Sequence, residues 1–125
     1  MATIQVIFDN IEVHRDGDVV DRGEVYWNLK VDGVSVEHRS SSNPMTVDSP
    51  RTISLGGSHT VVKFLSDHLT VSGSVSEEDP GGGNDELTTF THDYVEGNNW
   101  GVGQHSAHRF DKNLDVTVNY TIMRV

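Results

Sequence analysis

Residues 24–38 read Glu24-Val25-Tyr26-Trp27-Asn28-Leu29-Lys30-Val31-Asp32-Gly33-Val34-Ser35-Val36-Glu37-His38, and they decide the fold class. Apolar residues recur at every second position in the first half, which is the period of a β-strand with one buried face. Asp32-Gly33 suits a two-residue type I′ turn, because both residues of that turn need positive φ angles. Residues 34–38 continue as the return strand. The segment therefore predicts an antiparallel hairpin with four inward residues, Val25, Trp27, Leu29 and Val31.

Alternation of the same kind extends in both directions from the hairpin. Toward the N-terminus the apolar parity changes between Phe8 and Ile11, which predicts a β-bulge around Asp9-Asn10. Toward the C-terminus, residues 114–122 form the most regular alternating segment of the chain. No segment has the spacing of an amphipathic helix. We predict an all-β chain of about eight short strands, folded as one antiparallel β-sandwich domain over residues 1–125.

Turn-forming residues separate the remaining predicted strands. Residues 40–50, with three consecutive serines and two prolines, are expected to form a surface loop, and residues 96–103 a second, glycine-rich loop. The other strands are predicted at residues 51–55, 60–65, 68–76, 87–94 and 105–110.

Composition excludes several classes of function. The net charge is −10 with nine scattered Lys and Arg residues, which argues against a nucleic-acid partner. The chain has no cysteine, so a disulfide scaffold, a thiolate zinc site and a cysteine nucleophile are excluded. No apolar run is long enough to span a bilayer, and no signal segment is visible, so we expect a cytoplasmic chain, or an extracellular one if a signal was trimmed.

Nine of the 19 acidic residues lie in two short segments, residues 16–24 and 77–86. Asp-x-Asp spacing places carboxylates on one side of a turning backbone, and the glycines let carbonyl groups turn the same way. Calcium binds six to eight such oxygens, and a site with oxygen ligands alone disfavours zinc and copper. The candidate ligands are Asp16, Asp18, Asp21, Glu78, Asp79 and Asp85, with Glu24 and Glu77 as second choices.

Two alternatives remain open for these segments. Either loop alone also fits an ordinary solvated turn, since Asp, Asn and Gly are common turn residues. Magnesium is the alternative ion, although its reluctance to lose water suits a flexible cage of carboxylates less well. The calcium interpretation therefore requires that the two loops converge at one end of the sandwich.

Two stretches carry a resemblance to a known family. The first is Phe-Asp-x-Ile-x-Val at residues 8–13, and the second is Asp-Gly-Asp-x-x-Asp-x-Gly-Glu-x-Tyr-Trp at residues 16–27, followed later by the other acidic loop. Together they resemble C2-like calcium-binding β-sandwich domains. The resemblance implies that loops at one end bind calcium through aspartates, here Asp16 and Asp18 in the first loop and Asp79 and Asp85 in the later one. Membrane-docking members carry basic or apolar loop tips, whereas these loops are acidic, so calcium binding is implied more strongly than phospholipid binding.

Our first hypothesis is a non-enzymatic calcium-binding module that orders a surface for docking a protein, glycan or lipid. The second is a carbohydrate-binding or adhesion sandwich in which Trp100 and Tyr94 contact sugar and calcium is purely structural, although we favour a Trp100 that packs into the core. An enzyme with paired carboxylates as acid and base ranks last. Exposed loops do not provide the buried environment that shifts the pKa values of two carboxylates apart. His105 and His108, three residues apart, are expected on opposite faces of a strand and form a poor chelate.

Overall fold

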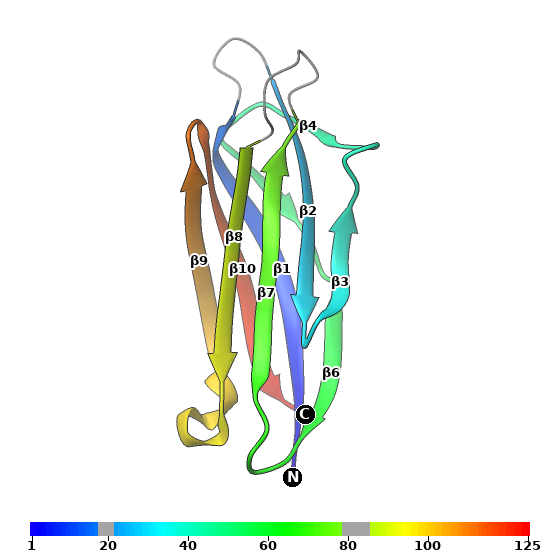
Figure 1. Ribbon diagram of the computed structural model, residues 1–125, viewed down its shortest axis with the longest axis vertical. Helices are drawn as coiled ribbons and strands as arrows, with labels where there is room; N and C mark the ends of the chain where they lie inside the picture. The colour runs from blue at the N-terminus through cyan, green and yellow to red at the C-terminus, as the bar shows by residue number, and fades with distance from the viewer. Residues whose placement is uncertain (18–21, 79–85) are drawn as a thin grey trace.

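The computed structural model describes residues 1–17, 22–78 and 86–125, which form ten strands and one short 3-10 helix (Figure 1). The elements are β1 (Ala2–Asp16), β2 (Gly23–Val31), β3 (Val34–Arg39), β4 (Met45–Val47), β5 (Arg51–Ser54), β6 (Ser58–Lys63), β7 (Leu69–Glu77), β8 (Glu86–Tyr94), η1 (Glu96–Gly101), β9 (Gly103–Asp111) and β10 (Leu114–Arg124).

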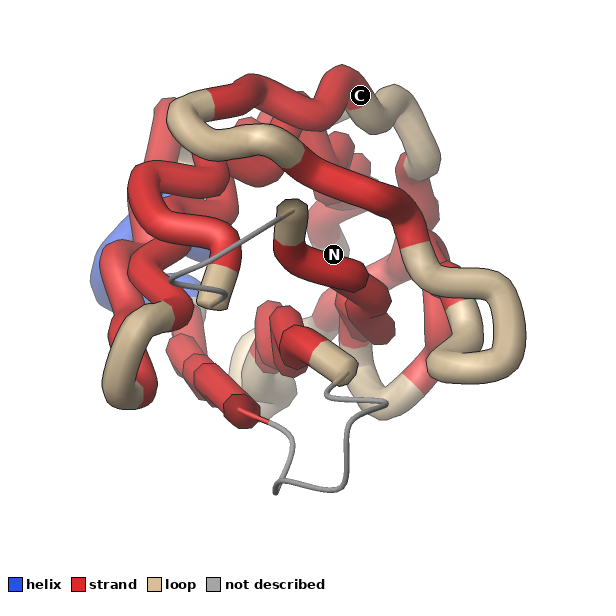
Figure 2. Tube along the Cα trace, turned by 90° about the horizontal axis from the view of Figure 1, so that it is seen from above, coloured by secondary structure: helices blue, strands red, loops and turns tan. Residues whose placement is uncertain are grey.

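The strands form two antiparallel sheets. One has the order β5-β1-β10-β9, with β6 also pairing with β1, and the other has the order β3-β2-β7-β8, with β4 also pairing with β2. Seen from above, the strands of the two sheets enclose the interior (Figure 2). The predicted all-β sandwich is therefore confirmed. Within the part of the chain that is described, no helix is long and apolar enough to cross a membrane.

The hairpin that decides the fold class forms as predicted from β2 and β3. Asp32 and Gly33 have φ angles of 50° and 79°, as a type I′ turn requires. The four inward residues of β2 are all buried, with 6% or less of each exposed. In β10, five alternating residues are likewise buried, namely Leu114, Val116, Val118, Tyr120 and Ile122. Alternation therefore identifies the core of both sheets.

Two bulges interrupt the pairing of β1 with β10. The first lies between Phe8 and Asn10, where the sequence predicts it. The second lies between Val13 and Arg15 and was not predicted. Because the second bulge places two consecutive exposed residues on the outer face, Asp16 returns to the inner face and lies opposite the buried Leu114. The second bulge therefore decides which way Asp16 points.

Three local predictions are corrected by the structure. The surface loop expected at residues 40–50 contains β4, which is too short for alternation to reveal. The glycine-rich loop expected at residues 96–103 contains the 3-10 helix η1, in which Asn99 and Trp100 have φ angles of 55° and 57°. The strand expected from Leu87 begins at Glu86, and Leu87 is 53% exposed while Glu86, Thr88 and Phe90 are buried.

Candidate metal centre

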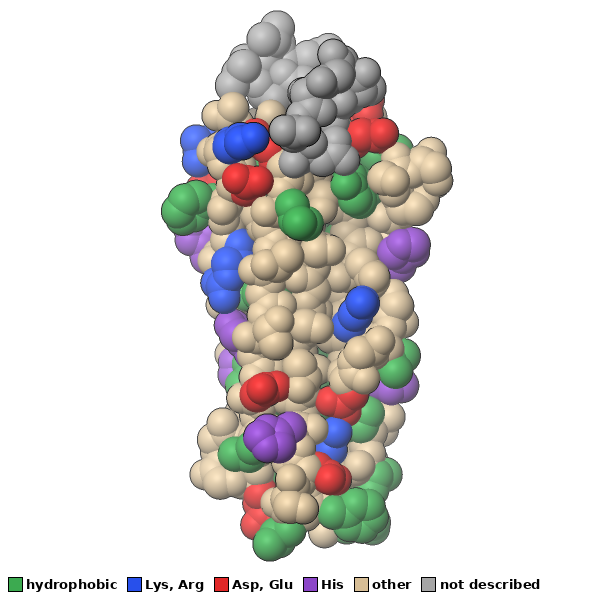
Figure 3. Space-filling view, viewed as in Figure 1, with side chains coloured by type: hydrophobic (Ala, Val, Ile, Leu, Met, Phe, Trp, Pro, Cys, Tyr) green, Lys and Arg blue, Asp and Glu red, His purple; other side chains and the backbone are tan. Residues whose placement is uncertain are grey.

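The acidic end is the end of the sandwich formed by Asp16, Gly17, Glu77, Glu86 and Asn113. There β1 and β7 end while β2 and β8 begin (Figure 1). In the paired strands Glu77 lies opposite Glu86, and the amide of Glu78 donates to the carbonyl of Glu24 over 2.8 Å. The described parts of the two acidic segments are therefore neighbours. Acidic side chains also occur at the lower end of the face shown in Figure 3. The acidic end is therefore distinguished by the meeting of the two acidic segments rather than by the number of acidic residues.

Three carboxylates at the acidic end are buried inside the sandwich rather than displayed on loops. Asp16 and Glu77 are each 5% exposed, and Glu86 is 6% exposed. Glu77 lies opposite the buried Val25, and Asp16 lies opposite the buried Leu114, so both face inward. Burying a carboxylate is costly unless hydrogen bonds or a cation compensate its charge. The hydrogen-bond partners of each carboxylate therefore indicate whether it needs a cation.

Asp16 is held by a neighbouring loop. Its Oδ2 accepts hydrogen bonds from both the amide and the hydroxyl of Ser49, each over 3.1 Å. These two bonds fix the carboxylate at the end of β1, where β1 meets the segment that precedes β5. Asp16 therefore brings an oriented carboxylate to the acidic end.

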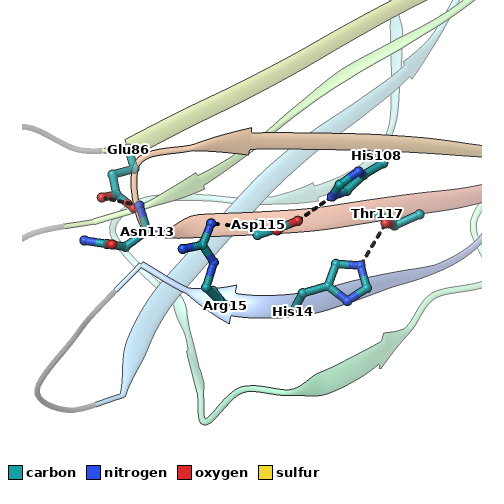
Figure 4. Close-up of polar contacts among 7 residues, drawn as sticks. All are labelled: His14, Arg15, Glu86, His108, Asn113, Asp115 and Thr117. Carbon is teal, nitrogen blue, oxygen red and sulfur yellow. Dashed lines mark hydrogen bonds and ion pairs between the residues drawn. The ribbon is translucent and has the colours of Figure 1, made fainter.

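Glu86 is only half compensated. Its Oε1 accepts a hydrogen bond from the amide of Asn113 over 3.3 Å, which Figure 4 shows at the turn between β9 and β10. Its Oε2 is buried and has no hydrogen-bond partner among the described residues. Within residues 1–17, 22–78 and 86–125 the other such atom is the indole Nε1 of Trp27, a neutral donor. Because a buried, unpaired carboxylate oxygen costs more than a neutral group, Glu86 Oε2 is the atom here that most requires a partner.

Two glycines let the backbone approach these carboxylates closely. Gly17 has a φ angle of 87°, and a Cβ atom there would lie 2.7 Å from Cγ of Glu77 and 2.9 Å from Oε2 of Glu86. A Cβ atom at Gly23 would lie 2.0 Å from the carbonyl oxygen of Asp16. Any side chain at either position would collide with the carboxylates or their backbone. The acidic end is therefore built around glycine.

The structure brings together part of the predicted ligand set. Asp16 and Glu77 lie inside the acidic end, while Glu24 and Glu78 are half-buried and joined through their backbones. The remaining candidates lie outside the described residues, namely Asp18, Asp21, Asp79 and Asp85.

Glu86 was missed as a candidate by sequence reasoning, which treated it as the end of a loop. A signal was present in the sequence. Glu86, Thr88 and Phe90 share one parity, and Phe90 is the bulky apolar residue that marks the inward face of this strand. Extending that parity by two residues places Glu86 inside the sandwich.

A second group, the aromatic cluster, is centred on the buried Tyr120. It comprises Tyr120, the half-buried His92, Tyr94 and His105, and Trp100, which belongs to the same hydrophobic core. The hydroxyl of Tyr120 is hydrogen bonded with the hydroxyl of Tyr94 over 2.7 Å and with Nδ1 of His92 over 3.0 Å. The rings of Tyr120 and His105 are stacked, with centroids 5.2 Å apart. Trp100 is 1% exposed, which confirms the packed interpretation. Its indole ring therefore presents no surface to a sugar.

Burial changes the protonation of two members of this cluster. Burial, followed by the hydrogen bond with Tyr94, raises the pKa of Tyr120 well above its usual range. Burial lowers the pKa of His92, and the positive charge of Arg109 and the ring of His105 lower it further. Both groups therefore stay neutral near pH 7, as suits a structural hydrogen-bond network.

Comparison with known proteins gives structural matches and no sequence matches. No family model matches the chain, and neither does any curated protein. The C2A domain of a plant extended synaptotagmin 1 superposes with a TM-score of 0.59 at 9% identity, covering 98% of this chain and 93% of that domain. A further C2 domain gives 0.55 at 15% identity, covering 98% of each chain.

A third similar structure is part of a larger protein. Human GIVD cytosolic phospholipase A2, solved with an inhibitor and terbium chloride, gives a TM-score of 0.54 at 12% identity. The match covers 99% of this chain and 17% of the phospholipase. Identities this low show the fold alone. The chain therefore has a C2-like β-sandwich fold, as the two sequence stretches suggested.

Proposed function

We propose that this protein is a non-enzymatic calcium-binding module whose acidic end binds Ca²⁺ and thereby orders a docking surface. The proposed ligands are the six candidates from the sequence together with one residue from the structure, namely Asp16, Asp18, Asp21, Glu78, Asp79, Asp85 and Glu86. Glu24 and Glu77 remain second choices.

The observation that carries this proposal is the buried Oε2 of Glu86, which has no hydrogen-bond partner in the described part of the chain. It lies beside Gly17, and the same glycine also packs against Glu77. An oxygen of this kind needs a cation or a donor. Calcium prefers carboxylate and backbone carbonyl oxygens as ligands, which these carboxylates and glycines can supply. The proposed ligand set contains no imidazole or thiol, the groups that favour other metals.

Binding of the ion would then order the docking surface at the acidic end. Asp16 is oriented by Ser49 and Glu86 by Asn113, so the base of the site is fixed before an ion arrives. Two unit charges about 5 Å apart repel by roughly 3 kcal/mol at an effective dielectric constant near 20. Calcium supplies the charge that removes this repulsion. C2-like folds commonly bind lipids or proteins, and an ordered acidic end is the surface we propose for such a partner or for a glycan.

Calorimetric titration with calcium, together with thermal melts in calcium and in chelator, tests the proposal. We expect measurable heat and a higher melting temperature in calcium, since an ion at a hundredfold excess over its Kd stabilises the fold by about 2.7 kcal/mol. The double variant Asp18→Asn with Asp79→Asn should lose calcium binding and still fold without the ion. The absence of both heat and a melting shift in the wild-type protein would refute the proposal.

A matched pair of substitutions at the other end supplies the control. Asp67 and Asp93 each accept one hydrogen bond near the turn between β6 and β7, and asparagine preserves an acceptor oxygen. Asp67→Asn with Asp93→Asn makes the same change in net charge and should leave calcium affinity unchanged. Equal affinities for the two double variants would show that the assigned ligands are wrong.

A further inference from the structure

A second group of metal-ligating side chains lies on the outer face of the sheet that contains β1, β10 and β9. The outer-face triad is His14, His108 and Asp115 (Figure 4). One ring nitrogen of each histidine and one carboxylate oxygen all lie within 4.8 Å of one another. Both histidines are exposed, and Asp115 is half-buried. None of the three belongs to the acidic end.

Strand register and a bulge create this juxtaposition. His108 lies opposite Thr117 in the pairing of β9 with β10, and Asp115 is two residues along β10 on the same face. His14 is the extra residue of the second bulge in β1, which turns its ring outward next to Thr117. Three strands therefore contribute one residue each, although the residues are far apart in sequence.

The side chains are already partly oriented toward one another. Nε2 of His108 lies 2.6 Å from Oδ1 of Asp115, and Nε2 of His14 lies 2.9 Å from the hydroxyl of Thr117. The two imidazole rings are edge to face, with centroids 5.8 Å apart. Arg15 lies 3.8 Å from Oδ2 of Asp115, the other carboxylate oxygen. Arg15 therefore engages one oxygen of Asp115 and leaves Oδ1 directed at the histidines.

Two imidazole nitrogens and one carboxylate oxygen form a donor set typical of zinc sites with an open fourth position. Zinc bonds of about 2.0–2.1 Å in a tetrahedron separate neighbouring ligand atoms by about 3.3 Å. Nε2 of His108 and Oδ1 of Asp115 are closer than that value, at 2.6 Å, and all three ligand atoms lie within 4.8 Å of one another. Exposed imidazoles can reach the required spacing by rotating about their side-chain bonds. The mixed nitrogen and oxygen set disfavours calcium, which takes oxygen ligands.

We propose that His14, His108 and Asp115 bind one Zn²⁺ ion, with water in the fourth position. The ion would replace the direct contact between His108 and Asp115. It would also join β1 to β9 across β10, which links the first strand of the chain to its last hairpin.

Zinc titration by calorimetry tests this site, with calcium kept saturating so that the acidic end does not contribute. We expect one zinc ion per chain. His14→Ala and His108→Ala should each lower the affinity by at least about 100-fold, because removing even the outer-shell partners of metal ligands costs 10–100-fold. Asp115→Asn should weaken binding as well. The matched controls His38→Ala and His68→Ala remove exposed histidines elsewhere and should keep wild-type affinity.

Two results would overturn the proposal. One is the absence of zinc binding up to about 1 mM in the wild-type protein. The other is wild-type affinity in both His14→Ala and His108→Ala, which would leave the triad as an ordinary ion pair beside a histidine. Nuclear magnetic resonance of the imidazole groups gives a second readout, in which zinc should shift the signals of His14 and His108 and leave those of His38 and His68 in place.

Discussion

The acidic end and the aromatic cluster both place polar groups inside the same sandwich, but they differ in whether those groups have hydrogen-bond partners. In the aromatic cluster Tyr120 is fully buried, and its hydroxyl has two hydrogen-bond partners, Tyr94 and His92. At the acidic end Oε2 of Glu86 is equally enclosed and has none among the described residues. One polar group is closed by the protein itself, while the other is left open.

This difference separates a structural role from a ligand-binding role. A closed network of neutral groups stabilises the fold and gains nothing from an added ligand. An open, charged group destabilises the fold on its own and is relieved only by an added cation. Without metal, removing a polar group should therefore lower the free energy of unfolding in the aromatic cluster and raise it at the acidic end.

The largest effect is expected from Trp100→Ala. Removing this buried indole ring should destabilise the protein by about 3–5 kcal/mol, since large-to-small core substitutions combine lost burial with a cavity. Urea unfolding measures the loss. Calcium affinity should stay at the wild-type value, because η1, which contains Trp100, lies at the opposite end of the sandwich from the acidic end (Figure 1). A small loss of stability with a loss of ligand binding would instead make Trp100 an exposed contact residue.

Glu86→Gln should change stability and calcium affinity in opposite directions. Without metal the variant should be more stable than the wild-type protein by about 1 kcal/mol, because the buried charge is gone and the hydrogen bond from Asn113 can be retained. Calcium affinity should fall by about tenfold or more, since the charge of the ligands tunes affinity. Chemical unfolding in chelator and calorimetry in calcium provide the two readouts.

Two variants calibrate that experiment. Glu96→Gln makes the same change at an exposed position in η1 and should affect neither quantity. Tyr120→Phe removes a polar group from the closed cluster and should cost about 1 kcal/mol in stability with no effect on calcium. If Glu86→Gln also loses stability in chelator, the acidic end is as closed as the aromatic cluster and the contrast disappears.

The smallest expected effect is a pH dependence from His92. Its pKa is lowered by burial first and by Arg109 second, so the folded state favours the neutral ring. The resulting stability is fully present above about pH 6.5, the ordinary histidine value, and is lost as the pH falls through the lowered pKa. Unfolding at several pH values should show a shallower loss of stability on acidification for His92→Gln than for the wild-type protein.

An exposed histidine gives the comparison for that series. His38→Gln makes the same substitution at an exposed position on β3 and should reproduce the wild-type pH profile. Histidine titration by nuclear magnetic resonance should place His92 below the usual value. A midpoint for His92 at or above that value would contradict the neutral role assigned to it.

Local patterns predicted much of the fold. The hairpin at Asp32-Gly33 followed from turn chemistry, and the bulge near Asp9 followed from a change of apolar parity. Both signals are contained in a few adjacent residues. The strand β4 was missed because residues 45–47 are too few to alternate. The bulge at His14 was missed because His14 and Arg15 are both polar and leave no break in the apolar pattern.

The candidate sites also differ in whether adjacent residues in the sequence reveal them. The acidic end was suggested by composition, because its carboxylates are close together in sequence. Glu86 was overlooked because composition assigned it to a loop, whereas its parity with Phe90 assigned it to the interior. The outer-face triad could not be predicted, since it depends on which residues of three strands lie opposite one another. The spacing of His105 and His108 predicts opposite faces of the strand, which the structure confirms, but it says nothing of the partners that other strands bring to His108.

The bulge at His14 has an evolutionary consequence. It adds one residue to β1, and the two exposed residues His14 and Arg15 together take the place of one. A chain lacking His14 would keep Val13 and Asp16 on the inner face by plain alternation, with Arg15 outside. A single-codon deletion could therefore erase the histidine chemistry of the outer face and leave the acidic end intact. The two surfaces can thus be gained or lost independently within one lineage.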